Sequence, residues 1–278
     1  MDSSLVLAAL ASALLHACWN AAVKANASPP HAMTAQMVGS ACLSVPIVLV
    51  TGLPGPAAWP WMALSSCFAM GAVASLLRGY RHGGFGVVYP MTRASSVLLV
   101  LPLAAVAAGE WPSWTGVAGV ALVSLAVLLL AVGGGRAPTL PRPALAWTLV
   151  AAACTACSVV CDARGVRTAG SALSYGCALS VLNGVVWAGL QWRAGLRPAA
   201  VAAQWRMALP GSVAAMASYL LILWVWTQAP IALASALRDT SAIFATLIAI
   251  VILREPFNRP AVLAVVLATI GAILIRLG

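Results

Sequence analysis

Long apolar segments almost free of charge constrain this chain more than any other feature of its sequence. Ten of them follow one another, at 3–24, 33–51, 61–80, 87–108, 114–132, 144–164, 171–192, 207–228, 231–253 and 260–277. A helix crosses the hydrocarbon core of a bilayer with about 20 apolar residues. Only 7% of the residues are charged, whereas soluble domains carry about 25%. We therefore predict an all-α, multi-pass membrane protein of ten transmembrane helices.

The positive charge of the chain indicates a lipid partner and not a nucleic acid. The formal net charge is +10, but the basic residues stand singly at the ends of apolar segments. No cluster of Lys and Arg is present that could follow a phosphate backbone. Basic residues at helix ends orient helices in a bilayer, and both a monomer and a homodimer are compatible with this pattern.

The chain reads as two related halves. An offset of 145 residues superposes polar residues of the halves: Arg93 on Arg238, Ser96 on Ser241 and Glu110 on Glu255. Glycines and prolines, which break helices, are most frequent between the fifth and sixth segments. We predict a first repeat at 1–133, a linker at 134–143 and a second repeat at 144–278. Because five spans is an odd number, the second repeat is expected to be inverted in the membrane.

The distribution of basic residues between loops predicts the orientation of the helices. Ten belong to the odd-numbered loops and adjoining helix ends: Lys24, Arg78, Arg81, Arg136, Arg142, Arg193, Arg197, Arg206, Arg254 and Arg259. Three belong to the other side: Arg164, Arg167 and Arg276. Cytoplasmic loops carry the excess of Lys and Arg, so both termini are expected outside the cytoplasm.

Ionisable residues inside the apolar segments are candidates for function. Such a group costs on the order of 3 kcal/mol in hydrocarbon and normally faces the bundle interior or a water-filled cavity. In the fourth segment Tyr89, Arg93 and Ser96 share one helical face. In the ninth, Arg238 is the repeat mate of Arg93, and its neighbour Asp239 points in another direction. Arg238 and Asp239 therefore each need a separate partner.

Two interpretations of the buried arginines stay open. Arg93 and Arg238 are either clamps that bind carboxylates or backbone carbonyls, or contacts for an anionic group of a substrate. We take both as candidate substrate-binding residues, together with Tyr89 and Ser96. Asp239 lies deep in its segment and is the better candidate for a proton relay.

The first segment adds three polar or aromatic candidates. His16 and Asn20 lie four residues apart, with Trp19 beside them. His16 is a candidate for proton coupling, although a buried histidine is more often a hydrogen-bonding residue. Trp19 and Asn20 are candidate substrate contacts, although most tryptophans in membrane proteins are interfacial anchors.

The sixth segment carries a polar face that ends in a carboxylate. Thr155, Ser158 and Asp162 lie at i, i+3 and i+7. Asp162 is a third candidate for proton coupling. An ion pair with the nearby Arg164 or Arg167, or a position already at the membrane interface, is nevertheless the favoured explanation.

We expect no metal and no cofactor. Cys154, Cys157 and Cys161 lie at helical spacing, but no second Cys or His cluster completes a coordination shell. Cysteine is also a common small residue in apolar helices. Glu110 and Glu255 precede the fifth and tenth segments, where a carboxylate is favourable near a helix start.

Short motifs recur in a specific order along the chain. The first segment contains Leu15-His16-Ala17-Cys18-Trp19-Asn20-Ala21-Ala22-Val23-Lys24, and the fourth opens with Val87-Val88-Tyr89-Pro90-Met91-Thr92-Arg93. Gly109-Glu110, Gly116 and Gly119 follow, and the second half carries Ala236-Leu237-Arg238-Asp239 and Arg254-Glu255-Pro256. In these motifs the chain resembles the EamA-type branch of the drug/metabolite transporter superfamily.

The resemblance implies an inner-membrane carrier of two inverted five-helix halves, with a central cavity lined by helices 1, 3, 4, 6, 8 and 9. Members of the family carry amino acids, sugar derivatives, nucleotide precursors or drugs. Two departures distinguish the halves of this chain. Asp239 has no mate at Ala94, and Arg254 stands where the first half has Gly109.

The expected function is secondary active transport of a small amphipathic metabolite, amino-acid-like or an organic anion, across the bacterial inner membrane by alternating access. A flippase for a lipid-linked substrate is the alternative, which a lateral opening to lipid would favour. A membrane-embedded enzyme is less well supported, because the five acidic residues are widely separated along the chain and such enzymes usually cluster carboxylates.

Overall fold

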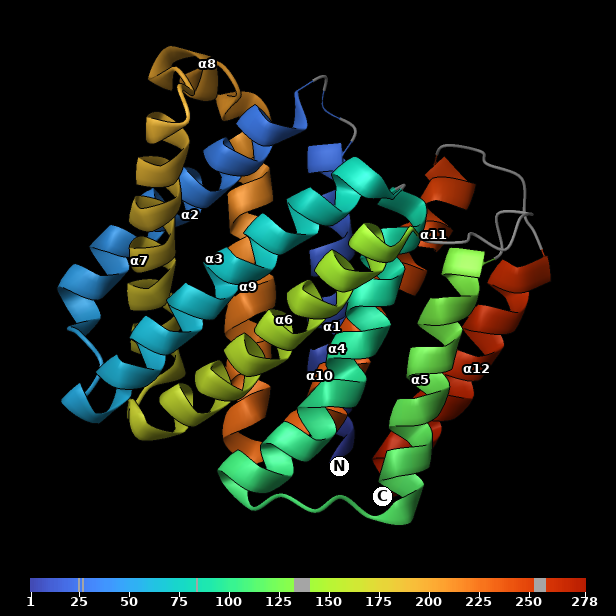
Figure 1. Cartoon of the computed structure of the whole chain (residues 1–278). Helices are drawn as coiled ribbons and strands as arrows, with labels where there is room; N and C mark the ends of the chain where they lie inside the picture. Colours follow the sequence, from blue (N-terminus) through green and yellow to red (C-terminus); the bar gives the residue numbers. More distant parts are fainter. Residues whose placement is uncertain (25, 27, 84, 133–140, 253–258) are drawn as a thin grey trace.

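A computed structural model describes the chain except for residues 25, 27, 84, 133–140 and 253–258 (Figure 1). The first half consists of α1 (Ser3–Lys24), α2 (Pro29–Thr51), α3 (Trp59–His82), α4 (Phe85–Ala108) and α5 (Trp114–Val132). The second half consists of α6 (Arg142–Thr168), α7 (Ala172–Arg193), α9 (Trp205–Gln228), α10 (Ile231–Asp239), α11 (Ser241–Ile252) and α12 (Arg259–Leu277). Two short helices, η1 (Pro56–Ala58) and α8 (Pro198–Ala202), lie in connections. The all-α prediction is confirmed, and most of the predicted linker lies outside the described residues.

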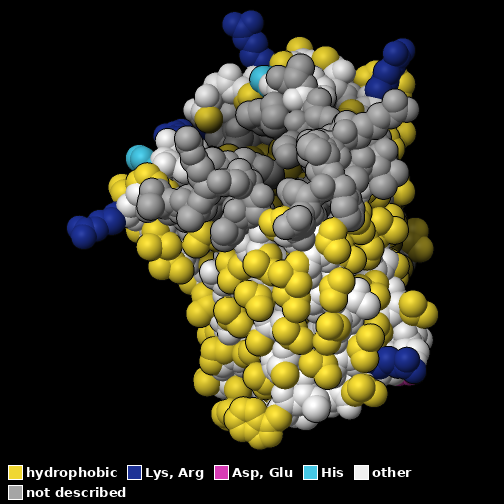
Figure 2. Space-filling model, turned by 90° about the vertical axis from the view of Figure 1, so that its right-hand side faces the viewer, with side chains coloured by type: hydrophobic (Ala, Val, Ile, Leu, Met, Phe, Trp, Pro, Cys, Tyr) yellow, Lys and Arg dark blue, Asp and Glu magenta, His cyan; other side chains and the backbone are white. Residues whose placement is uncertain are grey.

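The outer surface of the bundle is suited to hydrocarbon. Within the described part, seven helices are long and apolar enough to cross a membrane, and α5 and α12 contribute shorter apolar stretches. Large apolar side chains are exposed, among them Leu49 at 81%, Val50 at 87% and Val106 at 87%. Figure 2 shows hydrophobic side chains spread over the middle of one face. Exposure of such a surface to water would be costly, whereas lipid accommodates it. The chain is therefore a multi-pass membrane protein.

Helices of one half pack against helices of the other half, in pairs that the repeat relates to each other. α1 packs along α9, and α3 packs along α6; the offset of 145 residues converts one pair into the other. α2 packs on its repeat mate α7, and α5 packs on its repeat mate α12. In the same way α4 packs on α6, whereas α10 and α11 pack on α1 (Figure 1). This exchange is what two inverted halves of five spans produce.

Both termini lie at the same end of the bundle (Figure 1). The amino group of Met1 donates a hydrogen bond of 3.0 Å to the carbonyl oxygen of Arg276. Most of the Lys and Arg side chains visible in Figure 2 project at the opposite end. On this face the basic side chains are therefore concentrated away from the termini, as the predicted orientation requires; Arg136 and Arg254 lie outside the described residues.

The ninth predicted span is interrupted, which corrects the expectation of one continuous helix at 231–253. α10 ends at Asp239, and α11 begins at Ser241. The hydroxyl of Thr240 donates to the carbonyl oxygen of Leu237 over 2.6 Å, and its amide also bonds back to Leu237 over 3.3 Å. Such local bonds of Thr compete with the regular helical ladder. The mate of this span, α4, continues without a break through Arg93.

Candidate functional site

Arg93 is the centre of a hydrogen-bonded network that joins α1, α4 and α10. Its Nη1 lies 3.2 Å from Oδ1 of Asp239, and its Nη2 lies 2.8 Å from Nε2 of His16. Its Nε donates to the hydroxyl of Tyr89 over 3.3 Å. Every donor nitrogen of this guanidinium thus has a partner within the protein, as a charge in the membrane interior requires.

The helices place these side chains by simple spacing. Tyr89 and Arg93 are one turn apart on α4, and the guanidinium carbon of Arg93 lies 5.4 Å from the centre of the Tyr89 ring, within the range of a cation–π contact. Asp239 is the last residue of α10, so the break at Thr240 sets the position of its carboxylate. The predicted candidates His16, Tyr89, Arg93 and Asp239, which come from both halves, meet in one place.

The contact between Arg93 and His16 defines the state of the imidazole. A guanidinium can only donate hydrogen bonds. Nε2 of His16 must therefore accept, which makes His16 a neutral imidazole that carries its proton on Nδ1. A second proton on this ring would place two positive groups in contact and break the bond. His16 is thus in a position where gain of a proton changes the surroundings of Arg93.

The remaining candidates on α1 and α4 lie beside this network. The rings of His16 and Trp19 meet edge to face with centres 5.0 Å apart. The side-chain amide of Asn20 donates to the carbonyl oxygen of His16 over 2.9 Å. The hydroxyl of Ser96 donates to the carbonyl oxygen of Arg93 over 2.8 Å. Asn20 and Ser96 therefore bond to the backbone of their own helices.

Arg238 faces another set of residues. Its guanidinium carbon lies 6.0 Å from the centre of the Trp226 ring. Among the described residues, Nε of Arg238 has no hydrogen-bond partner, and the same is true of Nε1 of Trp226 and Oγ of Ser235. Trp226 is fully buried, and Ser235 is 4% exposed. Buried donors without partners are rare and costly, so this part of the interior has unmet hydrogen-bonding capacity.

Asp162 is bound by two tyrosines, which corrects the favoured expectation of an ion pair near the membrane surface. Tyr175 of α7 donates to Oδ1 over 3.2 Å, and Tyr219 of α9 donates to Oδ2 over 2.9 Å. Asp162 is 6% exposed. Neither expected partner forms an ion pair with it, because Arg164 lies over the ring of Trp61 and Arg167 binds Glu110.

The two tyrosines are functional candidates that the sequence interpretation missed. The chain contains only four tyrosines, and Tyr175 and Tyr219 both lie inside apolar segments, where a hydroxyl group usually needs a polar partner. That scarcity is a signal that could have identified them. A glycine also makes the contact possible: a Cβ atom at Gly165 would lie 2.5 Å from the Tyr175 ring.

Arg167 takes part in a separate clamp near the termini. It donates to the carbonyl oxygens of Trp226 and Ala229 over 2.7 and 2.9 Å, and to Oε1 of Glu110 over 2.6 Å. Oε2 of Glu110 accepts from the amide of Ile231, also over 2.6 Å. Glu110 therefore binds the start of α10 in the other half, whereas it was expected to act on the helix that follows it. Its repeat mate Glu255 lies outside the described residues.

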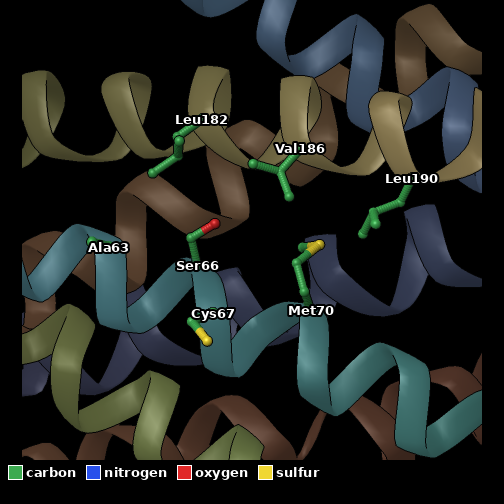
Figure 3. A pocket seen from close by; sticks show the side chains of 7 residues that line it. All are labelled: Ala63, Ser66, Cys67, Met70, Leu182, Val186 and Leu190. Atoms are coloured by element: carbon green, nitrogen blue, oxygen red, sulfur yellow. The ribbon is translucent and has the colours of Figure 1, made fainter.

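An apolar groove of about 390 Å³ lies between α3 and α7 (Figure 3). Its lining residues are mostly apolar: Ala63, Ser66, Cys67, Met70, Leu182, Val186 and Leu190. None of the predicted site residues lines this groove. The charged groups described above lie instead among the helices α1, α4, α6 and α10, which the resemblance places around a central cavity.

Fold and site together define a polytopic carrier built from two inverted halves with ionisable groups in its interior. The model of the EamA-like transporter family matches residues 2–132 and 142–277. The chain therefore belongs to this family and transports small molecules across a membrane. No curated protein matches its sequence. A solved crystal structure of a protein with 16% sequence identity has the same fold, with a TM-score of 0.81. The alignment covers 100% of this chain and 98% of the chain in that structure.

Proposed function

We propose that the protein is a secondary active transporter that moves a small amphipathic metabolite, amino-acid-like or an organic anion, across the bacterial inner membrane by alternating access. The observation that carries the proposal is the pair of arginines in the interior. Arg93 is neutralised by Asp239 at 3.2 Å, whereas Arg238 has no ion-pair partner among the described residues. Intramembrane arginines of this kind commonly line substrate pathways.

Substrate binding and proton binding are linked through these groups. Arg93, Arg238, Tyr89, Trp19, Asn20 and Ser96 are the proposed substrate-binding residues, and Asp239, His16 and Asp162 are the proposed proton-coupling residues. A proton on Asp239 removes the negative charge that holds Arg93, which frees this guanidinium for a substrate anion. A proton on His16 removes the second partner of Arg93.

The inverted halves supply the motion. We take the two repeats as 1–133 and 144–278, joined by the linker at 134–143. The bond between Arg93 and Asp239 crosses from α4 to α10, and thus from one half to the other. A rocking movement between the halves changes this contact, so the ion pair reports which side of the membrane the cavity faces.

The test is uptake of radiolabelled amino acids and carboxylates into proteoliposomes, with and without an imposed pH gradient. Arg238→Ala and Arg93→Ala are expected to lose uptake and to keep the elution volume of the folded protein. Arg193→Ala is the matched control, because Arg193 is exposed at the end of α7. Normal uptake by both site variants would contradict the proposed role.

A flippase for a lipid-linked substrate remains the second candidate. The groove between α3 and α7 is the observation that favours it, because its lining is mostly apolar and would suit an acyl or isoprenoid chain (Figure 3). Protein-dependent movement of a fluorescent lipid between leaflets of the same proteoliposomes, without uptake of soluble solutes, would favour the flippase over the transporter.

A further inference from the structure

We infer that the interior binds a dipolar molecule, with its anionic group at Arg238 and its cationic group at Asp162. The inference rests on the proposed transport function and narrows its substrate class to zwitterions. It depends on the two charged groups that the Arg93 network does not use.

The charges of the sites described above balance among the described residues, where two arginines, Arg93 and Arg238, stand against two aspartates, Asp162 and Asp239. Arg93 and Asp239 neutralise each other at 3.2 Å. Arg238 and Asp162 interact electrostatically, yet among the described side chains they form no ion pair within 4.0 Å. One cation and one anion therefore face the same interior without contact.

Other interactions keep these two charges apart. Tyr175 and Tyr219 bind both oxygens of Asp162, and Arg238 lies over the ring of Trp226. Opposite charges in a medium of low dielectric constant attract each other strongly. Because the two charges are not paired with each other, each of them can still bind an oppositely charged group of a ligand.

Each end retains hydrogen-bonding capacity of the right sign. A carboxylate has about four lone-pair positions. The hydroxyls of Tyr175 and Tyr219 occupy two of those on Asp162, and the side chain of Ser65 also hydrogen-bonds to it. An ammonium group can take the remaining position. Around Arg238, the unpartnered groups are Nε of the arginine itself, Nε1 of Trp226 and Oγ of Ser235, which donate to a carboxylate or a similar anion.

The other charged groups nearby do not complete either end. Arg93 acts electrostatically on Arg238, and the two cations repel each other. Asp239 acts on Arg238 as well but is bound to Arg93. Arg164, two residues from Asp162, lies over Trp61. A simple anion would leave Asp162 without a cation, and a simple cation would leave Arg238 without an anion. A zwitterion supplies a partner of opposite charge to both residues, so neither charge stays buried and unpaired.

The direct test uses the wild-type protein and three forms of each ligand. The probes are L-leucine, L-phenylalanine and 4-aminobutanoate, each compared with its N-acetyl form, which is only an anion, and its methyl ester, which is only a cation. Binding is measured as the shift in thermal unfolding of the purified protein, because a ligand stabilises the state it binds. We expect at least one free amino acid to bind about tenfold more tightly than both of its derivatives.

Two variants assign the charges to their residues. Asp162→Asn is expected to lose the preference for the free amino acid over its N-acetyl form, and Arg238→Gln the preference over the methyl ester. Asp2→Asn, at an exposed position, is the control and should leave both preferences unchanged. If Asp162→Asn fails to fold, Tyr219→Phe keeps the carboxylate and releases the lone pair that the Tyr219 hydroxyl occupies. A stronger preference for the free amino acid is then expected, and an unchanged preference would count against the site.

The outcomes separate this inference from the proposed function. Equal binding of the free and N-acetylated ligands, or binding of none of the free amino acids, overturns the dipolar site. Uptake of N-acetylated or other simple anions by the wild-type protein would then still support a transporter. Absence of uptake for every solute, with zwitterion binding intact, would instead contradict transport and leave the site in place.

Discussion

The guanidinium of Arg93 and the carboxylate of Asp239 meet at 3.2 Å across the boundary between the two halves of the protein. Arg93 belongs to the continuous helix α4, and Asp239 ends the interrupted helix α10. The repeat mate of Asp239 is Ala94, so the pair has no counterpart in the other half. The structural asymmetry of the candidate site is therefore centred on this ion pair.

Loss of one partner of this pair should be more harmful than loss of both. Asp239→Ala leaves the Arg93 charge in the interior, and removal of one member of a buried pair costs about 3–5 kcal/mol. The double variant Arg93→Met/Asp239→Ala is expected to recover most of that stability while it remains inactive in transport. Thermal unfolding in detergent measures the first effect. Equal stability of the single and double variants would show that the two charges do not depend on each other.

Gly165 should be essential for the contact between Tyr175 and Asp162. A Cβ atom at this position would lie 2.5 Å from the Tyr175 ring, so Gly165→Ala must displace the ring or the helix, at a cost of about 1–3 kcal/mol. Gly189→Ala in α7 is the matched control, because a Cβ atom there meets nothing within 4 Å. The control should be neutral or slightly stabilising, since alanine favours helices. Similar melting temperatures for both variants would contradict this packing.

The Arg167 clamp should stabilise the end of the bundle that carries the termini. Arg167→Ala removes bonds to two backbone carbonyls and to Glu110 and should cost about 2–3 kcal/mol. Glu110→Gln keeps an acceptor for the amide of Ile231 and should cost less. Arg276→Ala is an exposed control on the same end of the chain. A smaller loss for Arg167→Ala than for Glu110→Gln in thermal unfolding would show that the backbone bonds contribute little.

The helices could be predicted from the sequence because apolar length and helix breakers are local properties. The predicted span at 114–132 coincides with α5, and the others, apart from the interrupted ninth span, agree with their helices within a few residues. The break at Thr240 could not be predicted in this way. A threonine inside an apolar helix forms either regular or local bonds according to its packing, and packing is not visible in one sequence.

The charged residues of the candidate site could be identified in the sequence, but Tyr175, Tyr219 and the contacts between the residues could not. Helical spacing indicated that Arg238 and Asp239 need different partners. In the structure the partner of Asp239 is Arg93. The partners of Asp162 lie on α7 and α9, far along the chain, and no periodicity relates the registers of three helices. The expected ion pair with Arg164 or Arg167 was wrong because a short sequence distance was taken as proximity, whereas the side chains of α6 point in different directions.

Proton coupling should depend on Asp239. Asp239→Asn keeps the shape of the side chain but cannot gain or lose a proton, so uptake driven by an imposed pH gradient should fall about tenfold or more. Exchange of labelled for unlabelled substrate at equal pH needs no net proton movement and should persist. The measurement compares both assays on the same proteoliposomes. Persistence of gradient-driven uptake in Asp239→Asn would place the coupled proton elsewhere, at His16 or Asp162.

The orientation of the protein can be tested from its termini. Met1 and Arg276 are hydrogen-bonded neighbours, so both termini must lie on the same side of the membrane. The excess of basic residues at the opposite end predicts that this side is outside the cytoplasm. A C-terminal fusion to alkaline phosphatase should therefore be active in a bacterial host. A C-terminal fusion to green fluorescent protein should not fluoresce, because this protein does not fold correctly when it is exported in unfolded form. A fusion to the connection between α7 and α9 (193–205), where Arg193 and Arg197 lie, should give the reverse result. A fluorescent C-terminal fusion with an inactive phosphatase would invert the orientation, and the end of the bundle that carries the Arg167 clamp would then be the cytoplasmic one.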